Sequence, residues 1–154
     1  MNLVSPSAPI ADRLVETLYT EAMLLADETR SYFDQAGVIE RDALPPRQRV
    51  EFACEALKGT TRLMQLIAWL LLRKAVASGE LDEDAADAPQ RRLGEAPALE
   101  PDAVADLPPA AKRLLIAGAD LYERVRRIDE GIVDPPPVMA SPARSLLERL
   151  ERSL

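Results

Sequence analysis

The chain has 154 residues, of which 47% are apolar and only 4% aromatic, so we expect a core of aliphatic side chains and alanine. It has no histidine and one cysteine, Cys54, which argues against hydrolase triads, zinc sites and haem and excludes an internal disulfide. The net charge of −7 disfavours attraction to phosphate backbones, so no direct nucleic-acid partner is expected.

Neither a signal peptide nor a membrane span is predicted. The first residues lack a basic start followed by an apolar run. The longest nearly apolar run, residues 63–72, is far shorter than the roughly 20 residues that cross a bilayer. We therefore expect a cytoplasmic protein that does not bind membranes.

Thirteen prolines divide the chain, and none lies within residues 10–44, 47–88 or 110–134. A proline inside a helix costs about 3 kcal/mol, so long helices can run only in such gaps. Gly37, Gly79 and Gly131 are placed to end them. The sequence predicts an all-α fold: an N-terminal tail (1–8) and a three-helix bundle (9–131) with long helices at about 9–36, 45–78 and 108–130.

The first and third predicted helices each carry an apolar stripe at alternating steps of four and three residues, which is typical of bundle cores. On the first helix the stripe comprises Leu14, Leu18, Ala22, Leu25, Thr29, Tyr32 and Ala36. On the third it comprises Leu107, Ala111, Leu114, Gly118, Leu121, Val125 and Ile128.

The middle helix is apolar around most of its circumference, more than two neighbours would cover. At 100° per residue, Leu63, Met64, Ile67, Leu70 and Leu71 form one broad face, assigned to the core. Thr61, Gln65, Trp69, Leu72 and Val76 fall on the opposite side, and Tyr19 and Met23 stray from the stripe of the first helix. We expect these seven residues to form the interface of a symmetric homodimer. Alternatively, the acidic loop or the C-terminal helix covers this stripe within one chain.

Residues 80–106 form an acidic loop whose net charge of −7 equals that of the whole chain. The loop is poor in large apolar residues, so we expect a mobile connector, with a short helical turn at about 82–88. Alternatively, it is an electrostatic docking segment for a basic partner, in which Asp82, Glu83 and Asp84 are the leading residues.

The C-terminal part, residues 132–154, is a proline-rich linker followed by an amphipathic segment. Its apolar edge contains Leu146, Leu147, Leu150 and Leu154. About 13 residues form a marginal helix in water. The segment therefore either docks on a groove or becomes ordered when a partner binds, and its leucines are candidate docking residues.

No motif for catalysis, cofactor binding or metal binding is present. The glycines do not form a phosphate-binding loop. Glu51 and Glu55 share a helix face, but without histidine they predict a solvated face rather than a metal site. Cys54 is expected to be an inert core thiol. The sequence thus predicts a protein that binds other proteins, is not an enzyme and needs no cofactor.

The string Gly59–Val76 (GTTRLMQLIAWLLLRKAV), with Tyr19–Met23 (YTEAM) upstream and Leu121–Val125 (LYERV) downstream, resembles the RcdA family of alphaproteobacteria, named for regulation of CtrA degradation. The resemblance covers about residues 10–131. It implies a three-helix bundle that forms homodimers and works without catalysis. Family members are adaptors that help deliver cell-cycle regulators to the ClpXP protease, together with a response regulator and a cyclic-di-GMP effector.

Two functions follow as hypotheses. The first is an adaptor that tethers protein substrates to ClpXP, which needs two binding surfaces and no chemistry. The alternative is a structural helical subunit of a larger complex, with no role in proteolysis. An enzyme or a small-ligand binder is the least favoured class, because nothing in the sequence predicts a pocket of convergent polar groups.

Overall fold

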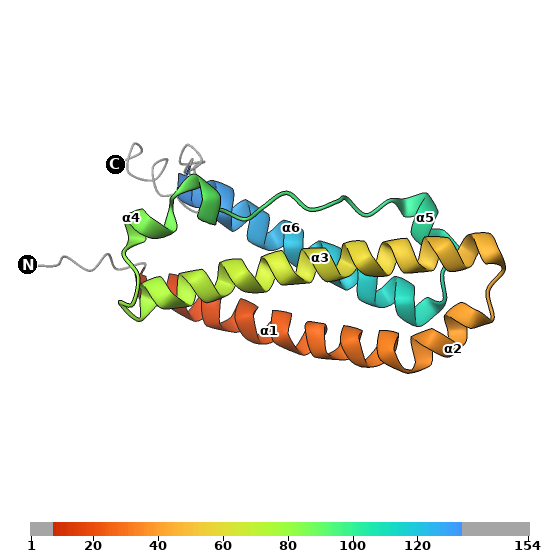
Figure 1. Cartoon of the computed structure of the whole chain (residues 1–154). Helices are drawn as coiled ribbons and strands as arrows, with labels where there is room; N and C mark the ends of the chain where they lie inside the picture. The colour runs from red at the N-terminus through yellow and green to blue at the C-terminus, as the bar shows by residue number, and fades with distance from the viewer. Residues whose placement is uncertain (1–7, 134–154) are drawn as a thin grey trace, which may run out of the picture.

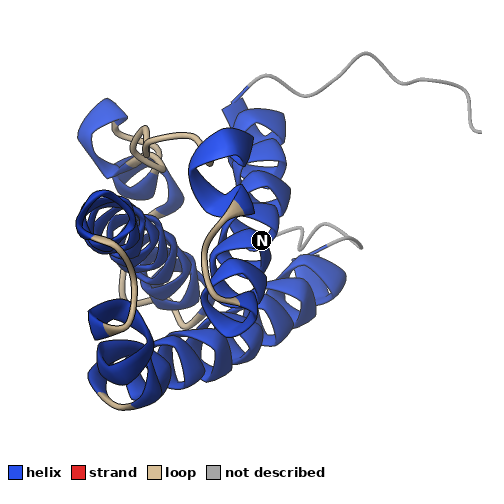
Figure 2. Cartoon of the chain, turned by 90° about the vertical axis from the view of Figure 1, so that its right-hand side faces the viewer, coloured by secondary structure: helices blue, strands red, loops and turns tan. Residues whose placement is uncertain are grey.

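The computed structural model describes residues 8–133 of the chain (Figure 1). All regular elements in this range are helical, as the sequence predicts (Figure 2). They are α1 (Ala8–Asp34), α2 (Ala36–Asp42), α3 (Pro46–Ala77), α4 (Glu83–Ala86), the 3-10 helix η1 (Pro89–Arg91), α5 (Pro101–Ala105) and α6 (Pro109–Val133). None of the described helices is long and apolar enough to cross a membrane.

The long helices α1, α3 and α6 pack against one another as a three-helix bundle (Figures 1 and 2). Most residues of the stripes predicted for the first and third helices lie in the core or at its edge, although Leu14 and Ala36 are exposed. One buried cluster comprises Leu18, Ala22, Leu63, Leu66, Trp69, Leu70, Leu121 and Val125. A second comprises Phe52, Val104, Leu107, Ala111 and Leu115.

Of the three glycines predicted to end helices, Gly79 does so, whereas Gly37 and Gly131 lie inside helices. Gly79 has a φ of +79° and follows the end of α3, as expected of a helix terminator. Gly37 instead lies buried inside α2, where a Cβ would come within 2.8 Å of the carbonyl oxygen of Tyr32. Gly131 lies inside α6. The glycine at position 37 therefore serves a close approach of two backbone segments rather than a left-handed turn.

The acidic loop follows a defined path in the structure, whereas the sequence predicts a mobile connector. It contains α4 at the predicted helical turn, as well as η1 and α5, and it returns along the bundle to the start of α6 (Figure 1). Val104 and Leu107 are buried in the second cluster. At the other end, Arg73 of α3 donates to Asp87 at 2.8 Å. Anchors at both ends hold a segment whose middle is poor in large apolar residues.

Candidate protein-interaction surfaces

Trp69, the centre of the predicted dimer interface, is only 3% exposed. Its Nε1–H donates to Asp129 Oδ1 at 2.9 Å, and Arg92 from the acidic loop pairs with the same carboxylate. The Arg73 guanidinium lies 5.3 Å from the centroid of the Trp69 ring. Gln65 donates to the carbonyl oxygen of Glu95 at 3.2 Å. The prediction of an exposed stripe through Trp69 is therefore wrong, because the loop of the same chain covers it.

The other residues of that predicted interface do not make up one open surface. Tyr19 is half-buried, with Lys74 Nζ at 4.0 Å from its ring centroid. Thr61, Leu72 and Val76 are also half-buried, whereas Met23 is exposed.

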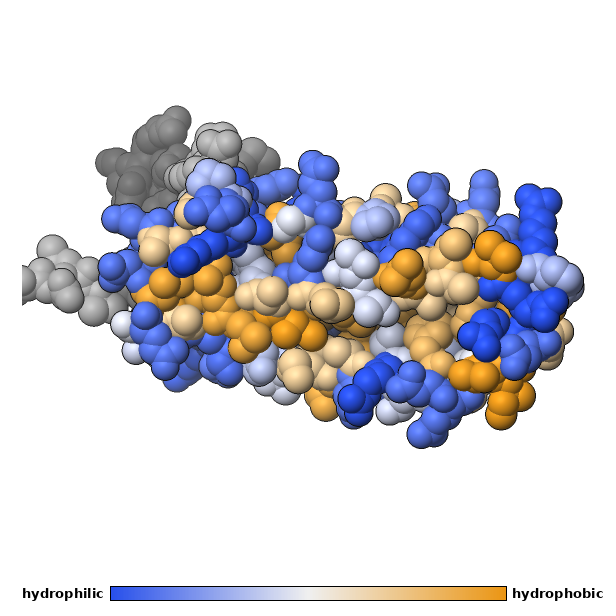
Figure 3. Space-filling view, viewed as in Figure 1, coloured by the Kyte–Doolittle hydropathy of each residue, from blue (hydrophilic) through white to orange (hydrophobic). Residues whose placement is uncertain are grey.

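An apolar stripe is nevertheless exposed along α3. It includes Met64 and Leu71, which were assigned to the core, and the half-buried Thr61 from the predicted interface. Its largest residues stand at steps of seven, and Leu57 and Met64 are 69% and 67% exposed. We call this stripe the α3 seam. Its members follow alternating steps of four and three residues: Val50, Cys54, Leu57, Thr61, Met64, Ala68, Leu71 and Ala75. Such spacing is that of the contact positions of a coiled coil. Figure 3 shows apolar side chains gathered along the course of α3.

The α3 seam contains no charged residue, and charged side chains stand beside it. Lys74 pairs with Glu16 of α1 at 3.4 Å, and Glu51 pairs with Arg47 at 3.7 Å. An apolar centre with a polar border is the usual anatomy of a protein interface. Cys54 is exposed within the seam, so the prediction of a buried thiol is wrong.

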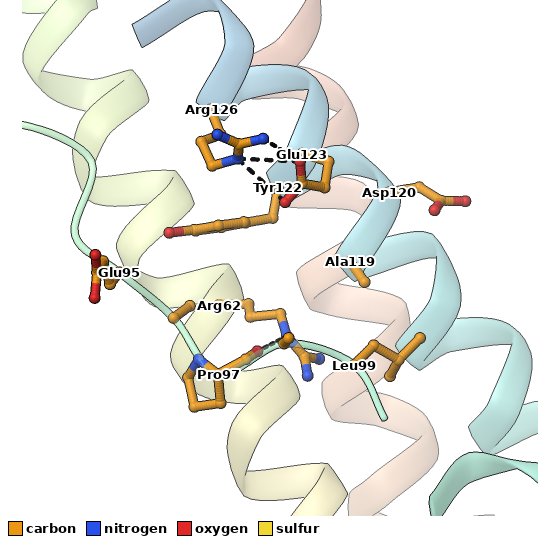
Figure 4. Close-up of a pocket in the computed structure, with 11 residues that line it drawn as sticks. Arg62, Glu95, Pro97, Leu99, Ala119, Asp120, Tyr122, Glu123 and Arg126 are labelled. Carbon is orange, nitrogen blue, oxygen red and sulfur yellow. Dashed lines mark hydrogen bonds and ion pairs between the residues drawn. The ribbon is translucent and has the colours of Figure 1, made fainter. Parts of the chain in front are cut away.

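A second surface lies where the acidic loop crosses the groove between α3 and α6. We call residues 94–98 the strap. Arg62 Nε donates to the carbonyl oxygen of Pro97 at 2.8 Å (Figure 4). The Tyr122 hydroxyl donates to the carbonyl oxygen of Gly94. Burial raises the pKa of Tyr122, so this hydroxyl keeps its proton. A cavity of about 410 Å³ lies beside the strap and is lined by both side chains.

Arg62 is only 2% exposed, and so is Glu55, seven residues earlier on the same helix. Burial lowers the pKa of the Arg62 guanidinium, and the nearby Glu55 carboxylate partly offsets that shift. The prediction that Glu55 belongs to a solvated face with Glu51 is wrong. Glu55 instead lies buried, with Lys58 Nζ at 3.1 Å and the buried Arg62 cation nearby.

Comparison with known structures places this geometry in a family. The crystal structure of RcdA from Caulobacter crescentus CB15 is 38% identical in sequence, with a TM-score of 0.63, and the match covers 76% of this chain and 88% of that chain. The chain belongs to the RcdA family. Residues 7–154 also match the family described as "Protein of unknown function (DUF1465)". No curated protein matches the chain. The resemblance seen in the sequence is thereby confirmed.

Of the residues predicted to dock partners, the structure describes only those of the acidic loop. Asp82, Glu83 and Asp84 are exposed at the start of α4, open to a partner. Leu146, Leu147 and Leu150 lie outside the described residues.

Five of the eight residues of the α3 seam lie in the string that carries the RcdA resemblance, yet the seam was not predicted from the sequence. Met64 and Leu71 were assigned to the core, and Val50, Cys54, Leu57, Ala68 and Ala75 were not predicted to lie at the surface. A usable signal was present, because eight uncharged residues keep a strict four–three spacing from position 50 to position 75.

Proposed function

We propose that the chain is a non-enzymatic cytoplasmic adaptor that tethers protein clients to the ClpXP protease, together with a response-regulator co-adaptor. The observation that carries this proposal is the 38% identity to RcdA over 76% of the chain. An adaptor accelerates degradation by raising the effective concentration of a client near the unfoldase. The exposed carboxylates of Asp82–Asp84 and the C-terminal leucines are the docking residues that we assign to partners.

We further propose that a second copy of the chain covers the α3 seam. The seam runs for about 37 Å along the helix, at 1.5 Å per residue. An uncharged stripe of this length on the surface of a protein usually marks an interface. A symmetric dimer is the commonest arrangement that buries one such surface of each copy.

The order of side chains in the α3 seam favours antiparallel pairing. Large residues occupy positions 50, 57, 64 and 71, and small ones occupy positions 54, 61, 68 and 75. When two seams run antiparallel about a two-fold axis between Arg62 and Leu63, Val50 faces Ala75 and Leu57 faces Ala68. In the same register, Met64 faces Thr61 and Leu71 faces Cys54. Each large side chain then meets a small one, which lets the two helices approach closely.

Met64→Asp is expected to abolish the dimer, because it would bury an unpaired charge close to the two-fold axis. Light scattering should give twice the chain mass of 16.9 kDa for the wild type and 16.9 kDa for the variant. Ile39→Asp is the matched control, since Ile39 is 75% exposed on α2, and this variant should stay dimeric. A wild type that is monomeric at micromolar concentration, or a dimeric Met64→Asp, would contradict the proposal.

The adaptor function is tested by reconstituted proteolysis with ClpXP, the response regulator and candidate clients from the same organism. Degradation of at least one client should accelerate with adaptor concentration and then saturate. If no client is degraded faster, and the chain purifies from cells at fixed stoichiometry with a partner other than the protease, it is a structural subunit instead.

A further inference from the structure

The strap is attached to the bundle in the way that a groove holds an extended peptide. Residues 94–98 form no helix and are mostly exposed. Leu93 and Leu99 flank them and are half-buried, and each packs against a different core cluster. Two apolar anchors, six residues apart, thus fix a stretch that contributes almost no apolar contact of its own. Peptide recognition commonly combines such anchors with hydrogen bonds to the main chain.

The hydrogen bonds between the anchors recognise only the main chain of the strap. Gln65 and Arg62 of α3 and Tyr122 of α6 donate to the carbonyl oxygens of residues 95, 97 and 94, respectively. None of these bonds depends on a strap side chain. Any extended segment with carbonyl groups at the same spacing could therefore accept them.

The groove offers more hydrogen-bonding capacity than the strap uses. Arg62 Nη1 and Nη2 and Gln65 Oε1 are buried and have no hydrogen-bond partner within residues 8–133. A cavity of about 410 Å³ adjoins Arg62, and one of about 290 Å³ adjoins Gln65 on the side of Trp69. Buried groups of this kind favour a ligand that satisfies them.

The unpartnered atoms match a peptide main chain better than an ion. Arg62 supplies donors and Gln65 supplies an acceptor, and the N–H and C=O groups of an extended chain meet both needs. The Arg62 cation already has the Glu55 carboxylate nearby, so the site is close to neutral. Exposed Glu95 and Asp120 at the rim disfavour an anion further.

We propose that the groove between α3 and α6 is a binding site for an extended peptide segment of a partner protein, and that the strap is its resident occupant. The partner segment carries leucine-sized residues six positions apart with small residues between them, as in Leu93–Leu99 (LGEAPAL). The partner displaces the strap, whose residues are mostly exposed. This site goes beyond the proposed delivery to ClpXP and does not depend on it.

A tethered occupant competes at an effective concentration of the order of millimolar, so a free peptide should bind the wild type weakly. Leu93→Ser/Leu99→Ser, which we call the released variant, removes both apolar anchors of the strap and so frees the groove. The probe is the capped peptide LGEAPAL with a fluorophore, and its binding is measured by fluorescence anisotropy. We expect the released variant to bind at least tenfold more tightly than the wild type. A peptide with both leucines replaced by serine should not bind.

Gln65→Ala/Tyr122→Phe, added to the released variant, removes two side chains that donate hydrogen bonds to the main chain of the bound segment. This change should reverse the gain in peptide affinity. Equal binding by the wild type and a released variant that still unfolds cooperatively would overturn the proposal. Binding that survives the loss of both donors would overturn it too. If the released variant does not fold, Ala96→Gly/Pro97→Gly/Ala98→Gly replaces it, because this change loosens the strap and keeps both anchors. The same two results, equal binding or binding without the two donors, would then overturn the proposal.

Discussion

Trp69→Ala is expected to lower the free energy of unfolding by about 3–5 kcal/mol, the usual cost of truncating a buried aromatic side chain. Trp69 packs in the first core cluster and donates to the carboxylate of Asp129. Its removal leaves a cavity and takes one partner from a carboxylate that is itself buried. Both losses occur within a single chain, so dimer formation is not needed to produce them.

Urea denaturation followed by circular dichroism, at one fixed protein concentration, measures this loss. Ile39→Ala truncates a side chain that is 75% exposed and should change stability by less than about 0.5 kcal/mol. A loss of less than about 1 kcal/mol for Trp69→Ala would mean that the indole ring is not part of the core.

Glu55→Ala should cost a similar amount, about 3–5 kcal/mol, because it leaves the buried Arg62 cation without its countercharge. Both side chains are 2% exposed, and Glu55 Oε1 also accepts from Lys58 at 3.1 Å. The matched control is Glu51→Ala, one helical turn earlier. Glu51 pairs only with the exposed Arg47 among the described residues, so its loss should cost less than about 0.5 kcal/mol.

A double-mutant cycle separates the electrostatic effect from the loss of packing. Arg62→Met together with Glu55→Ala should cost less than the sum of the two single changes, because the double variant leaves no unpaired charge that is fully buried; Lys58, which also loses Glu55, is 36% exposed. If the losses in unfolding free energy were strictly additive, Glu55 and Arg62 would not interact. The carboxylate of Glu55 would then not stabilise the Arg62 cation.

The sequence predicted α1 and α6 well because each has one apolar stripe, and the phase of that stripe says which side faces the core. α3 is apolar nearly all round, so its pattern predicts a helix but does not say which side is covered. The side that contains Trp69 is covered by the strap and by Arg92. Both lie more than 20 residues further along the chain than Trp69. Such long-range covering leaves no local periodic signal.

The buried charges of α3 escaped prediction for the same reason. Glu55 was predicted to lie on a solvated face, because charged side chains are rarely fully buried without partners. Arg62 is covered by the acidic loop and by α6, and the composition did not predict the path of that loop. By contrast, the short turn at α4 and the end of α3 at Gly79 depend on local residues, and both were predicted.

Covalent trapping of the dimer through the α3 seam is the sharpest test of the proposed pairing. Leu71→Cys adds a second thiol to Cys54, the native cysteine. Within one helix these residues are about 25 Å apart, too far for a disulfide, which joins Cα atoms about 6 Å apart. Antiparallel pairing brings residue 71 of one copy beside Cys54 of the other. We predict that oxidation converts Leu71→Cys into a covalent dimer on non-reducing gels, whereas the wild type and Ile39→Cys stay monomeric. A Leu71→Cys variant that cross-links no more than these two controls would rule out antiparallel pairing through the α3 seam.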